Sequence, residues 1–177
     1  MEQVAVNTAS DRHADLEQAF RDVLTPLVNP GFRLACAMLH DAQAAEDAVQ
    51  DASFIAWRKF KKLDDRGRAQ AWFLAIVANE CRNAKRRGWR SRVHLGLPAA
   101  MSVGSGEDRA VRNADLRRAL LQLGHDDRLV VVLYYYFDMP FQDIASVAGR
   151  SLSSVRNRLY RTIKRLRPDL AMQEDVR

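Results

Sequence analysis

The segment from Phe141 to Arg167 constrains the fold of this chain more than any other. It reads as two helices joined by a tight turn at Gly149, with Ser151 placed to cap the second helix through its hydroxyl. At 100° per residue, the apolar residues of the second helix gather on one side: Leu152, Val155, Leu159, Ile163 and Leu166. The pattern predicts that this side packs inside a small helical domain.

The opposite side of the second helix is polar and basic. Ser153, Ser154, Asn157, Tyr160, Arg161 and Lys164 point outward, and Arg156, Arg158 and Arg165 lie on the flanks. Hydroxyl and amide groups can reach base edges while guanidinium groups reach phosphates, which is typical of a helix-turn-helix that reads the DNA major groove. The alternative is a solvated basic helix on any small α-helical domain.

Composition favours an all-α fold with a polyanionic partner. The 177 residues carry 28 Lys and Arg against 22 Asp and Glu, a net charge of +6, with only 8 Gly and 5 Pro. The apolar run Val130–Phe137 fits a buried strand or a buried helix, and its helical flanks favour the helix. No stretch is long and apolar enough for a membrane span or a signal peptide, so we expect a cytoplasmic protein with no membrane insertion.

Cysteine and histidine usage gives no sign of a metal or another cofactor. Cys36 and Cys81 lie far apart within helical patterns and are expected to be buried thiols of a reducing compartment. The histidines are scattered without the spacing of metal ligands: His13, His40, His94 and His125.

Three zones follow one another along the chain. Residues 15–92 show an almost continuous helical pattern, residues 93–112 are rich in Gly, Ser and Ala, and residues 113–170 are helical again. We therefore expect two small helical domains joined by a flexible linker. Within these zones, Pro30 with Gly31 is expected to break or kink a helix, and Pro168 to mark the end of one.

The first zone contains segments of opposite charge. Residues 41–51 carry four acids and no base, including Glu46, Asp47 and Asp51, with Gln50 beside them. Residues 81–92 carry six bases and no acid. Because DNA would be repelled by the first segment and attracted by the second, the pair indicates two partners of opposite charge. Simple alternation of surface charge is the competing explanation for the acidic segment.

The basic segment continues a helix that begins near Trp72. One stripe of this helix is apolar, whereas another aligns Trp72 with Asn79, Asn83, Arg86 and Arg90, with Arg87 beside it. Amides can pair with unstacked base edges, arginines can hold phosphates and an aromatic ring can stack on a base. This helix is a candidate reader of opened DNA, although Trp72 fits an ordinary core position equally well.

Taken together, these segments resemble a bacterial sigma factor of the extracytoplasmic-function (ECF) group, which keeps only sigma regions 2 and 4. The resemblance rests on three segments in order: Ala45–Asp51 with Trp57, Trp72–Asn79 with Asn83 and Arg86–Arg87, and Ile144–Arg161 around Gly149. It extends from about Phe20 to Arg167. His40 stands where this family frequently has glycine.

The resemblance implies a role for each segment. Glu46, Asp47, Gln50 and Asp51 would dock on the clamp helices of the largest RNA polymerase subunit, and the polymerase flap would be a further contact. The helix from Trp72 would open and read the promoter minus-ten element. Ser153, Ser154, Arg156, Asn157, Arg158, Arg161 and Lys164 would bind the minus-thirty-five element. An anti-sigma factor is a further candidate partner.

The expected function is therefore promoter-specific initiation by core RNA polymerase, without catalysis by this chain. One alternative is a stand-alone helix-turn-helix regulator, but such proteins usually bind as dimers and no dimerisation zipper or ligand domain is visible. A DNA-processing enzyme would need a carboxylate cluster for metal or an activated nucleophile. The acids of residues 41–51 have no matching histidine or second cluster, which disfavours an enzyme.

Overall fold

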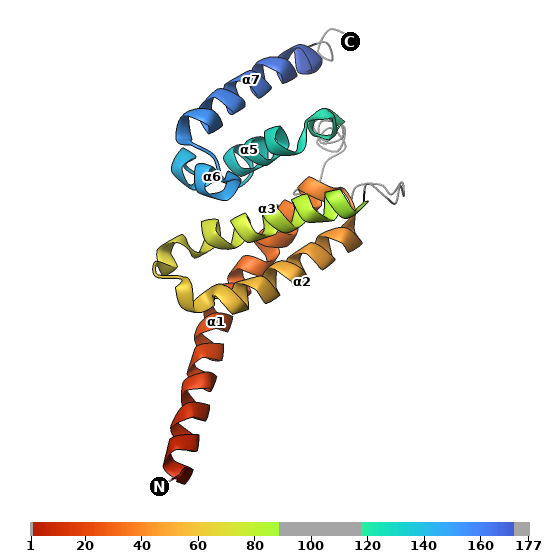
Figure 1. Cartoon of the computed structure of the whole chain (residues 1–177). Helices are drawn as coiled ribbons and strands as arrows, with labels where there is room; N and C mark the ends of the chain where they lie inside the picture. Colours follow the sequence, from red (N-terminus) through yellow and green to blue (C-terminus); the bar gives the residue numbers. More distant parts are fainter. Residues whose placement is uncertain (1, 89–117, 172–177) are drawn as a thin grey trace, which may run out of the picture.

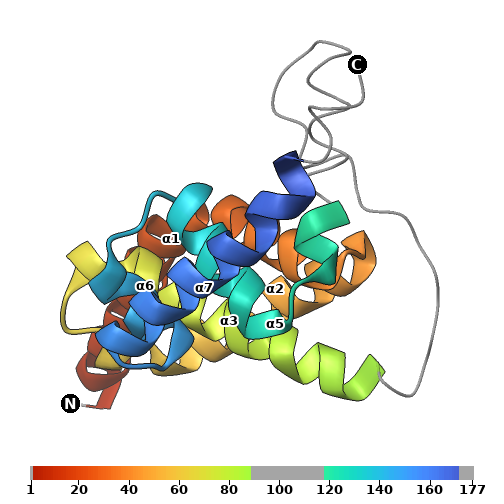
Figure 2. The same ribbon diagram turned by 90° about the horizontal axis from the view of Figure 1, so that it is seen from above.

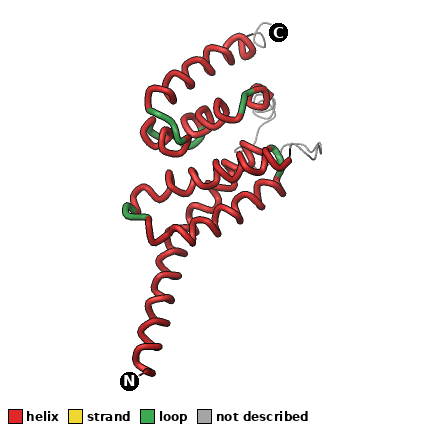
Figure 3. The backbone as a smooth tube through the Cα atoms, viewed as in Figure 1, coloured by secondary structure: helices red, strands yellow, loops and turns green. Residues whose placement is uncertain are grey.

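The computed structural model describes residues 2–88 and 118–171, with side chains for residues 12–86 and 118–166. Helices α1 (Glu2–Leu39), α2 (Ala42–Lys59) and α3 (Ala69–Gly88) come first, with the short 3-10 turns η1 (Phe60–Lys62) and η2 (Arg66–Arg68) between α2 and α3. Helices α5 (His125–Tyr135), α6 (Phe141–Ala148) and α7 (Leu152–Ala171) follow. The described residues contain no strand, so the all-α prediction is confirmed (Figure 3). The predicted linker, residues 93–112, lies outside the described residues.

Helices α1, α2 and α3 pack against one another as a bundle. Leu34, Phe73 and Leu74 are fully buried at its centre, and small residues along α2, such as Ala45 and Ala52, allow close approach. Gly31 lies so near α3 that a Cβ atom there would sit 2.8 Å from Cε1 of Phe73. The N-terminal part of α1 projects away from this bundle (Figure 1).

The second unit, residues 118–171, is built around the predicted turn at Gly149. This glycine ends α6 in the left-handed region, with φ of 62°, where a residue without a Cβ atom has no steric penalty. The Ser151 hydroxyl accepts from the backbone N–H of Ser154 at 3.3 Å and so caps α7. Val155 and Leu159 of α7 are buried, as predicted. The helix-turn-helix prediction is therefore confirmed by its turn, its cap and its packed face.

The first unit, which is the bundle of α1, α2 and α3, and the second unit lie against each other in layers. Helix α6 packs on α3 and α5 on α1, while α7 lies on the outer side of α5 and α6, away from the bundle (Figures 1 and 2). Buried residues of both units, from Leu34 to Leu159, belong to one contiguous core. The molecule is thus closed, with the helix-turn-helix seated on the first bundle.

Pro30 does not break α1 and Pro168 does not end α7, whereas the predicted kink at Pro30 stays a prediction. Helix α1 continues through Pro26 and Pro30, and α7 runs past Pro168 to Ala171. Pro30 removes the N–H that would bond the carbonyl of Pro26, but Pro26 is an exposed residue where water can satisfy that group. The contact of Gly31 with Phe73 then favours an unbroken α1, because tertiary packing outweighs the local cost.

The apolar run at residues 130–137 is helical, and the first helix is longer than the sequence pattern predicted. Most of Val130–Phe137 lies in α5, where Val130, Val131, Val132 and Leu133 are buried, so the helical interpretation is correct. Helix α1 begins at Glu2, well before the start of the predicted first zone. Among the described residues, no helix is long and apolar enough to cross a membrane.

Candidate nucleic-acid and polymerase interface

The outward face of α7 carries the side chains predicted to read DNA. Most of the predicted residues are exposed: Ser153, Arg156, Asn157, Arg161 and Lys164. Ser154 and Arg158 are half-buried. The buried residues Val155 and Leu159 hold this face outward, so the helix presents hydroxyl, amide and guanidinium groups together on one open surface.

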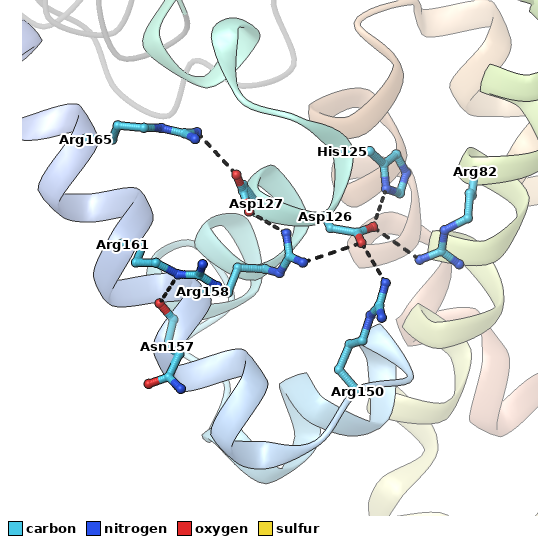
Figure 4. A network of polar contacts seen from close by, with 9 residues as sticks. All are labelled: Arg82, His125, Asp126, Asp127, Arg150, Asn157, Arg158, Arg161 and Arg165. Atoms are coloured by element: carbon cyan, nitrogen blue, oxygen red, sulfur yellow. Dashed lines mark hydrogen bonds and ion pairs between the residues drawn. The ribbon is translucent and has the colours of Figure 1, made fainter.

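Arg158 is committed to a carboxylate within its own unit. Its Nη1 lies 2.6 Å from Oδ1 of Asp127, and Arg165 reaches the other oxygen of Asp127 at 3.2 Å. Asp127, Arg158 and Arg165 line a pocket of about 320 Å³, and Arg161 lies on its wall as well. Arg161 also donates through Nε to the carbonyl of Asn157 at 3.3 Å. Figure 4 shows Arg158 and Arg165 reaching Asp127 at the start of α5, while Arg161 bonds Asn157 on its own helix. A phosphate would therefore have to replace Asp127 in order to hold Arg158.

The polar stripe of α3 is only partly available. Both amides donate to Oε1 of Glu80, Asn83 at 3.1 Å and Asn79 at 3.5 Å, but Asn79 is exposed whereas Asn83 is half-buried. Glu80 itself is 6% exposed, and the sequence pattern gave no indication of it as a partner. Trp72 packs against the buried core, where an ordinary core tryptophan would lie. The amide of Asn79 is thus better placed than that of Asn83 to meet a base.

The basic end of α3 is described only in part. Arg86 is exposed, whereas the side chain of Arg87 and the whole of Arg90 lie outside the described residues.

The acidic segment divides into a structural residue and an open surface. Asp41 caps α2, accepting from the N–H of Ala44 at 3.0 Å, a position that stabilises the helix start. The predicted docking residues are all exposed on α2: Glu46, Asp47, Gln50 and Asp51. Three of them line a groove of about 420 Å³ whose remaining walls are alanines of α2 and Ala84 of α3. Such a groove suits a long basic side chain, because the alanines at its floor can contact the aliphatic stem while the acids at its rim face the charged end.

Phe54 lies one turn beyond this acidic groove and was not predicted as a site residue. It is 62% exposed, with the guanidinium of Arg58 5.9 Å from its ring centre. An exposed aromatic residue on an otherwise charged helix is a frequent anchor of protein interfaces. The sequence signal was present in the spacing of Asp47, Gln50 and Phe54 along one face.

Asp126, at the start of α5, is the centre of a polar junction between the units. Its carboxylate lies 3.1 Å from Arg150, 3.7 Å from Arg82 of α3 and 4.0 Å from Arg158 (Figure 4). Burial alone would raise the pKa of Asp126, but the hydrogen bond from Arg150 and the charges of Arg158 and Arg82 outweigh it. The pKa therefore lies below its ordinary value.

His125 lies beside this carboxylate, in a cleft of about 610 Å³. The cleft is lined from α3 by Arg82, Lys85 and Arg86 and from the second unit by His125, Asp126 and Arg150. Burial and the nearby charge of Arg82 lower the pKa of His125, although Asp126 opposes them. His125 is therefore neutral at physiological pH.

Arg128 joins the two units through backbone carbonyls. It is 5% exposed and donates to Leu120, Leu121 and Leu123, which end the helical segment over residues 118–122, and to Met38 near the end of α1. The donor–acceptor distances are 2.9–3.0 Å. Because carbonyls at helix ends carry partial negative charge, they can replace a carboxylate for a buried guanidinium.

Both cysteines are free and buried, as predicted. Burial, with smaller contributions from Glu80 and Cys36, raises the pKa of Cys81 to about 12, so this thiol is unreactive at neutral pH. Within the described part of the chain, no group of three His, Cys, Asp or Glu side chains could hold a metal ion.

An all-α protein with a helix-turn-helix whose outward face is polar and basic, a second helix with amides and arginines, and an exposed acidic helix fits a class of DNA-binding transcription proteins. Comparison with protein families places the chain within that class. Residues 25–91 match Sigma-70 region 2, and residues 113–166 match Sigma-70 region 4. The chain belongs to the ECF group of bacterial RNA polymerase sigma factors, so the stand-alone regulator is not favoured. Sigma factors are initiation factors, not enzymes.

Curated relatives agree with this assignment, and a solved structure shares the fold. The chain is 28% identical over 148 residues to the ECF RNA polymerase sigma factor SigL of Mycobacterium tuberculosis, covering 81% of this chain and 82% of SigL. It is 28% identical over 173 residues to the probable RNA polymerase sigma factor RfaY of Xanthomonas campestris, covering 92% of this chain but 43% of RfaY. The sigma factor RpoE of Bartonella quintana, solved with the anti-sigma factor NepR, has the same fold. Its TM-score is 0.71 at 24% identity, covering 90% of this chain and 99% of RpoE.

Proposed function

We propose that this chain binds core RNA polymerase through α2 and directs it to promoters that α3 and α7 recognise. The observation that carries this proposal is the presence of three surfaces of different chemistry on one small chain. They are an acidic groove on α2, an amide and basic stripe on α3, and an exposed polar face on α7. A repressor or activator that binds DNA alone would need only the last of them.

The acidic groove of α2 is the proposed polymerase contact. Glu46, Asp47, Gln50 and Asp51 face solvent, and a basic coiled coil, such as the clamp helices expected from the family, complements them in charge. Phe54 extends the same face with an apolar side chain that loses water on docking. We therefore add Phe54 to the polymerase contact.

Promoter recognition is divided between α3 and α7. On α3, Asn79 is the proposed base contact of the opened minus-ten element, and Arg86 is a backbone contact, joined by Arg87 and Arg90. On α7, Asn157 and Arg161 stand on the open face and are the proposed base contacts of the minus-thirty-five element. Ser153, Ser154, Arg156, Arg158 and Lys164 complete that contact surface.

The proposed role also implies a domain organisation, further partners and a place of action in the cell. The proposed domains are residues 15–92 and 113–170, with residues 93–112 as the tether between them. The polymerase flap and an anti-sigma factor are further proposed partners, the latter because RpoE was solved with one. The proposed place of action is the cytoplasm, where core polymerase and promoters are found.

Reversing charge in the α2 groove tests the docking site. We expect Asp47→Arg with Asp51→Arg to weaken binding to core polymerase by tenfold or more, roughly 1.4 kcal/mol, because like charges then face each other. The fold should be unaffected, since exposed charges contribute little to stability. Calorimetric titration of core polymerase, with circular dichroism of each variant, provides the measurement.

The matched control is Asp22→Arg with Asp64→Arg, which makes the same change in net charge at exposed positions outside the groove. It should bind like the wild type. Equal weakening by both double variants would show that net charge alone governs binding, and the α2 docking site would then be rejected.

A further inference from the structure

Where the two units meet, arginines of the first unit contact carboxylates and a hydroxyl of the second. Arg68, directly before α3, lies 3.4 Å from Asp143 and 3.1 Å from the hydroxyl of Ser146, both on α6. Arg82, on α3, lies 3.7 Å from Asp126 of α5 (Figure 4). These two arginines therefore flank the segment of α3 that carries Asn79.

Both ion pairs are open to water. The side chains of Arg68 and Arg82 are 56% and 33% exposed, and those of Asp143 and Asp126 are 31% and 33% exposed. Exposed ion pairs contribute little to stability because water and salt screen them. Another anion can therefore replace either carboxylate at small cost, and a DNA phosphate offers the same charge-assisted hydrogen bonds.

The closed arrangement cannot hold a whole promoter. Packed helices lie about 8–10 Å apart, so α3 and α7, on opposite sides of the α5–α6 layer, are separated by roughly 20 Å. Promoter elements centred near minus ten and minus thirty-five are about 25 base pairs apart, or roughly 85 Å at about 3.4 Å per base pair. The units must separate before both elements are bound, and separation exposes Arg68 and Arg82 beside the minus-ten reader.

We propose that Arg68 and Arg82 are DNA-backbone contacts of the open molecule, and that Asp143 and Asp126 take the place of phosphates in the closed molecule. This inference rests on the proposed function, because it assumes that α3 meets promoter DNA. DNA then favours opening, since it competes with the second unit for the same cations.

The proposal assigns opposite effects to the two sides of each ion pair. Removing the carboxylates opens the molecule but leaves both cations available to DNA. Removing the arginines also opens the molecule but takes two phosphate contacts away. If the arginines served only to hold the units together, removing them would take no phosphate contact away, and the salt dependence of DNA binding would stay as in the wild type.

The experiment measures binding of the full chain to a fluorescein-labelled single-stranded DNA of about 30 nucleotides across a range of salt concentrations. Asp126→Asn with Asp143→Asn should tighten binding by about 3- to 10-fold, because the competing anions are weak surface partners. Arg68→Gln with Arg82→Gln should weaken it, and the slope of log affinity against log salt should fall by about 1.4, or about 0.7 for each lost phosphate contact.

Two controls separate this mechanism from simpler ones. Asp127→Asn removes another carboxylate from the first turn of α5, but its partners Arg158 and Arg165 both belong to the second unit. It should tighten binding less than the double carboxylate variant. Arg68→Lys with Arg82→Lys keeps both charges and should restore most of the salt dependence, even if the glutamine variant folds poorly.

Tightening by the carboxylate variant together with weakening by the glutamine variant supports the proposal. Effects in the same direction, or an unchanged salt slope in the glutamine variant, would overturn it. Run-off transcription by core polymerase with the wild-type chain tests the proposed function separately. Active wild-type protein with same-direction variant effects would reject the present inference alone, whereas inactive wild-type protein would reject the proposed function.

Discussion

Arg128 shows how one residue can decide the arrangement of the second unit. Its guanidinium donates to four backbone carbonyls, those of Leu120, Leu121, Leu123 and Met38. Replacement by an apolar side chain of similar length removes these donors. The carbonyl of Leu120 still accepts from the N–H of Leu123 at 3.1 Å, and Leu121 is exposed to water, but each carbonyl left buried and unpaired costs about 1–3 kcal/mol. Arg128 therefore contributes to stability as a hydrogen-bond donor and not as a member of an ion pair.

We expect Arg128→Met to lower the free energy of unfolding by about 2–5 kcal/mol. Urea denaturation of the full chain measures this change. Arg158→Met is the control, because it also removes an arginine of the second unit, but one that is only half-buried. Equal and small effects of the two substitutions would show that the carbonyls near Arg128 find other partners.

His125 makes stability depend on pH. Its pKa in the folded protein lies below the ordinary value of 6.5, because it is buried and faces Arg82, with Lys85 acting in the same direction and Asp126 opposing. Above that ordinary value the imidazole is neutral in both the folded and the unfolded chain. As pH falls, the unfolded chain takes up the proton first, so the free energy of unfolding decreases.

Between about pH 7.5 and pH 5.5, the wild type should therefore lose more stability than His125→Gln. Urea denaturation at each pH measures the difference between the two proteins, which cancels the contribution of every other titrating group. Identical pH dependence of both proteins would mean that His125 is not held in its neutral form.

Residues whose role is local were predictable from the sequence. Gly149 and Ser151 follow from turn and cap chemistry, and the structure confirms both. Arg128 and Asp126 were not predicted, because their partners come from other elements and no sequence spacing encodes them. Glu80 was missed for a related reason, since a charged residue on a polar stripe gives no sign that it is buried.

At the scale of elements, the faces of α3 and α7 follow the helical period closely. On the apolar stripe of α3, Phe73 and Val77 are buried. Of the apolar residues predicted to pack on α7, Val155 and Leu159 are buried and Leu152, Ile163 and Leu166 are half-buried. Helix ends were harder to predict, because α1 and α7 pass through prolines that local chemistry disfavours. His40, where the family frequently has glycine, follows α1 with φ of 61°, the left-handed conformation that favours glycine there.

The exposed face of α7 leads to a prediction about sequence preference. Asn157→Ala should change which minus-thirty-five sequences are used, since a good base contact discriminates by about 1–3 kcal/mol. Lys164→Ala is the control on the same helix, because a phosphate contact weakens all sequences alike. Selection from a library of randomised promoters measures both. If Asn157→Ala keeps the wild-type preference, Asn157 does not read a base.

At the scale of the whole molecule, the closed packing could not be predicted from the sequence. The contact between Arg68 and Asp143 joins residues 75 positions apart, and Arg128 reaches a carbonyl 90 positions away. Charge patterning of residues 41–51 and 81–92 indicated two partners of opposite sign, and the structure exposes Asp47 and Asp51 of the first segment and Lys85 and Arg86 of the second. It gave no indication that acids of the second unit would also pair with bases of the first.

Transcription from defined start sites is the central claim, and its most direct test combines sigma-free core RNA polymerase with the purified chain. The template is fragmented genomic DNA of the source organism, and the transcripts are mapped by sequencing their 5′ ends. We expect initiation at a limited set of sites that share two sequence elements, and loss of that set when Asp47→Arg with Asp51→Arg replaces the wild type. Transcripts identical with and without the chain would contradict it.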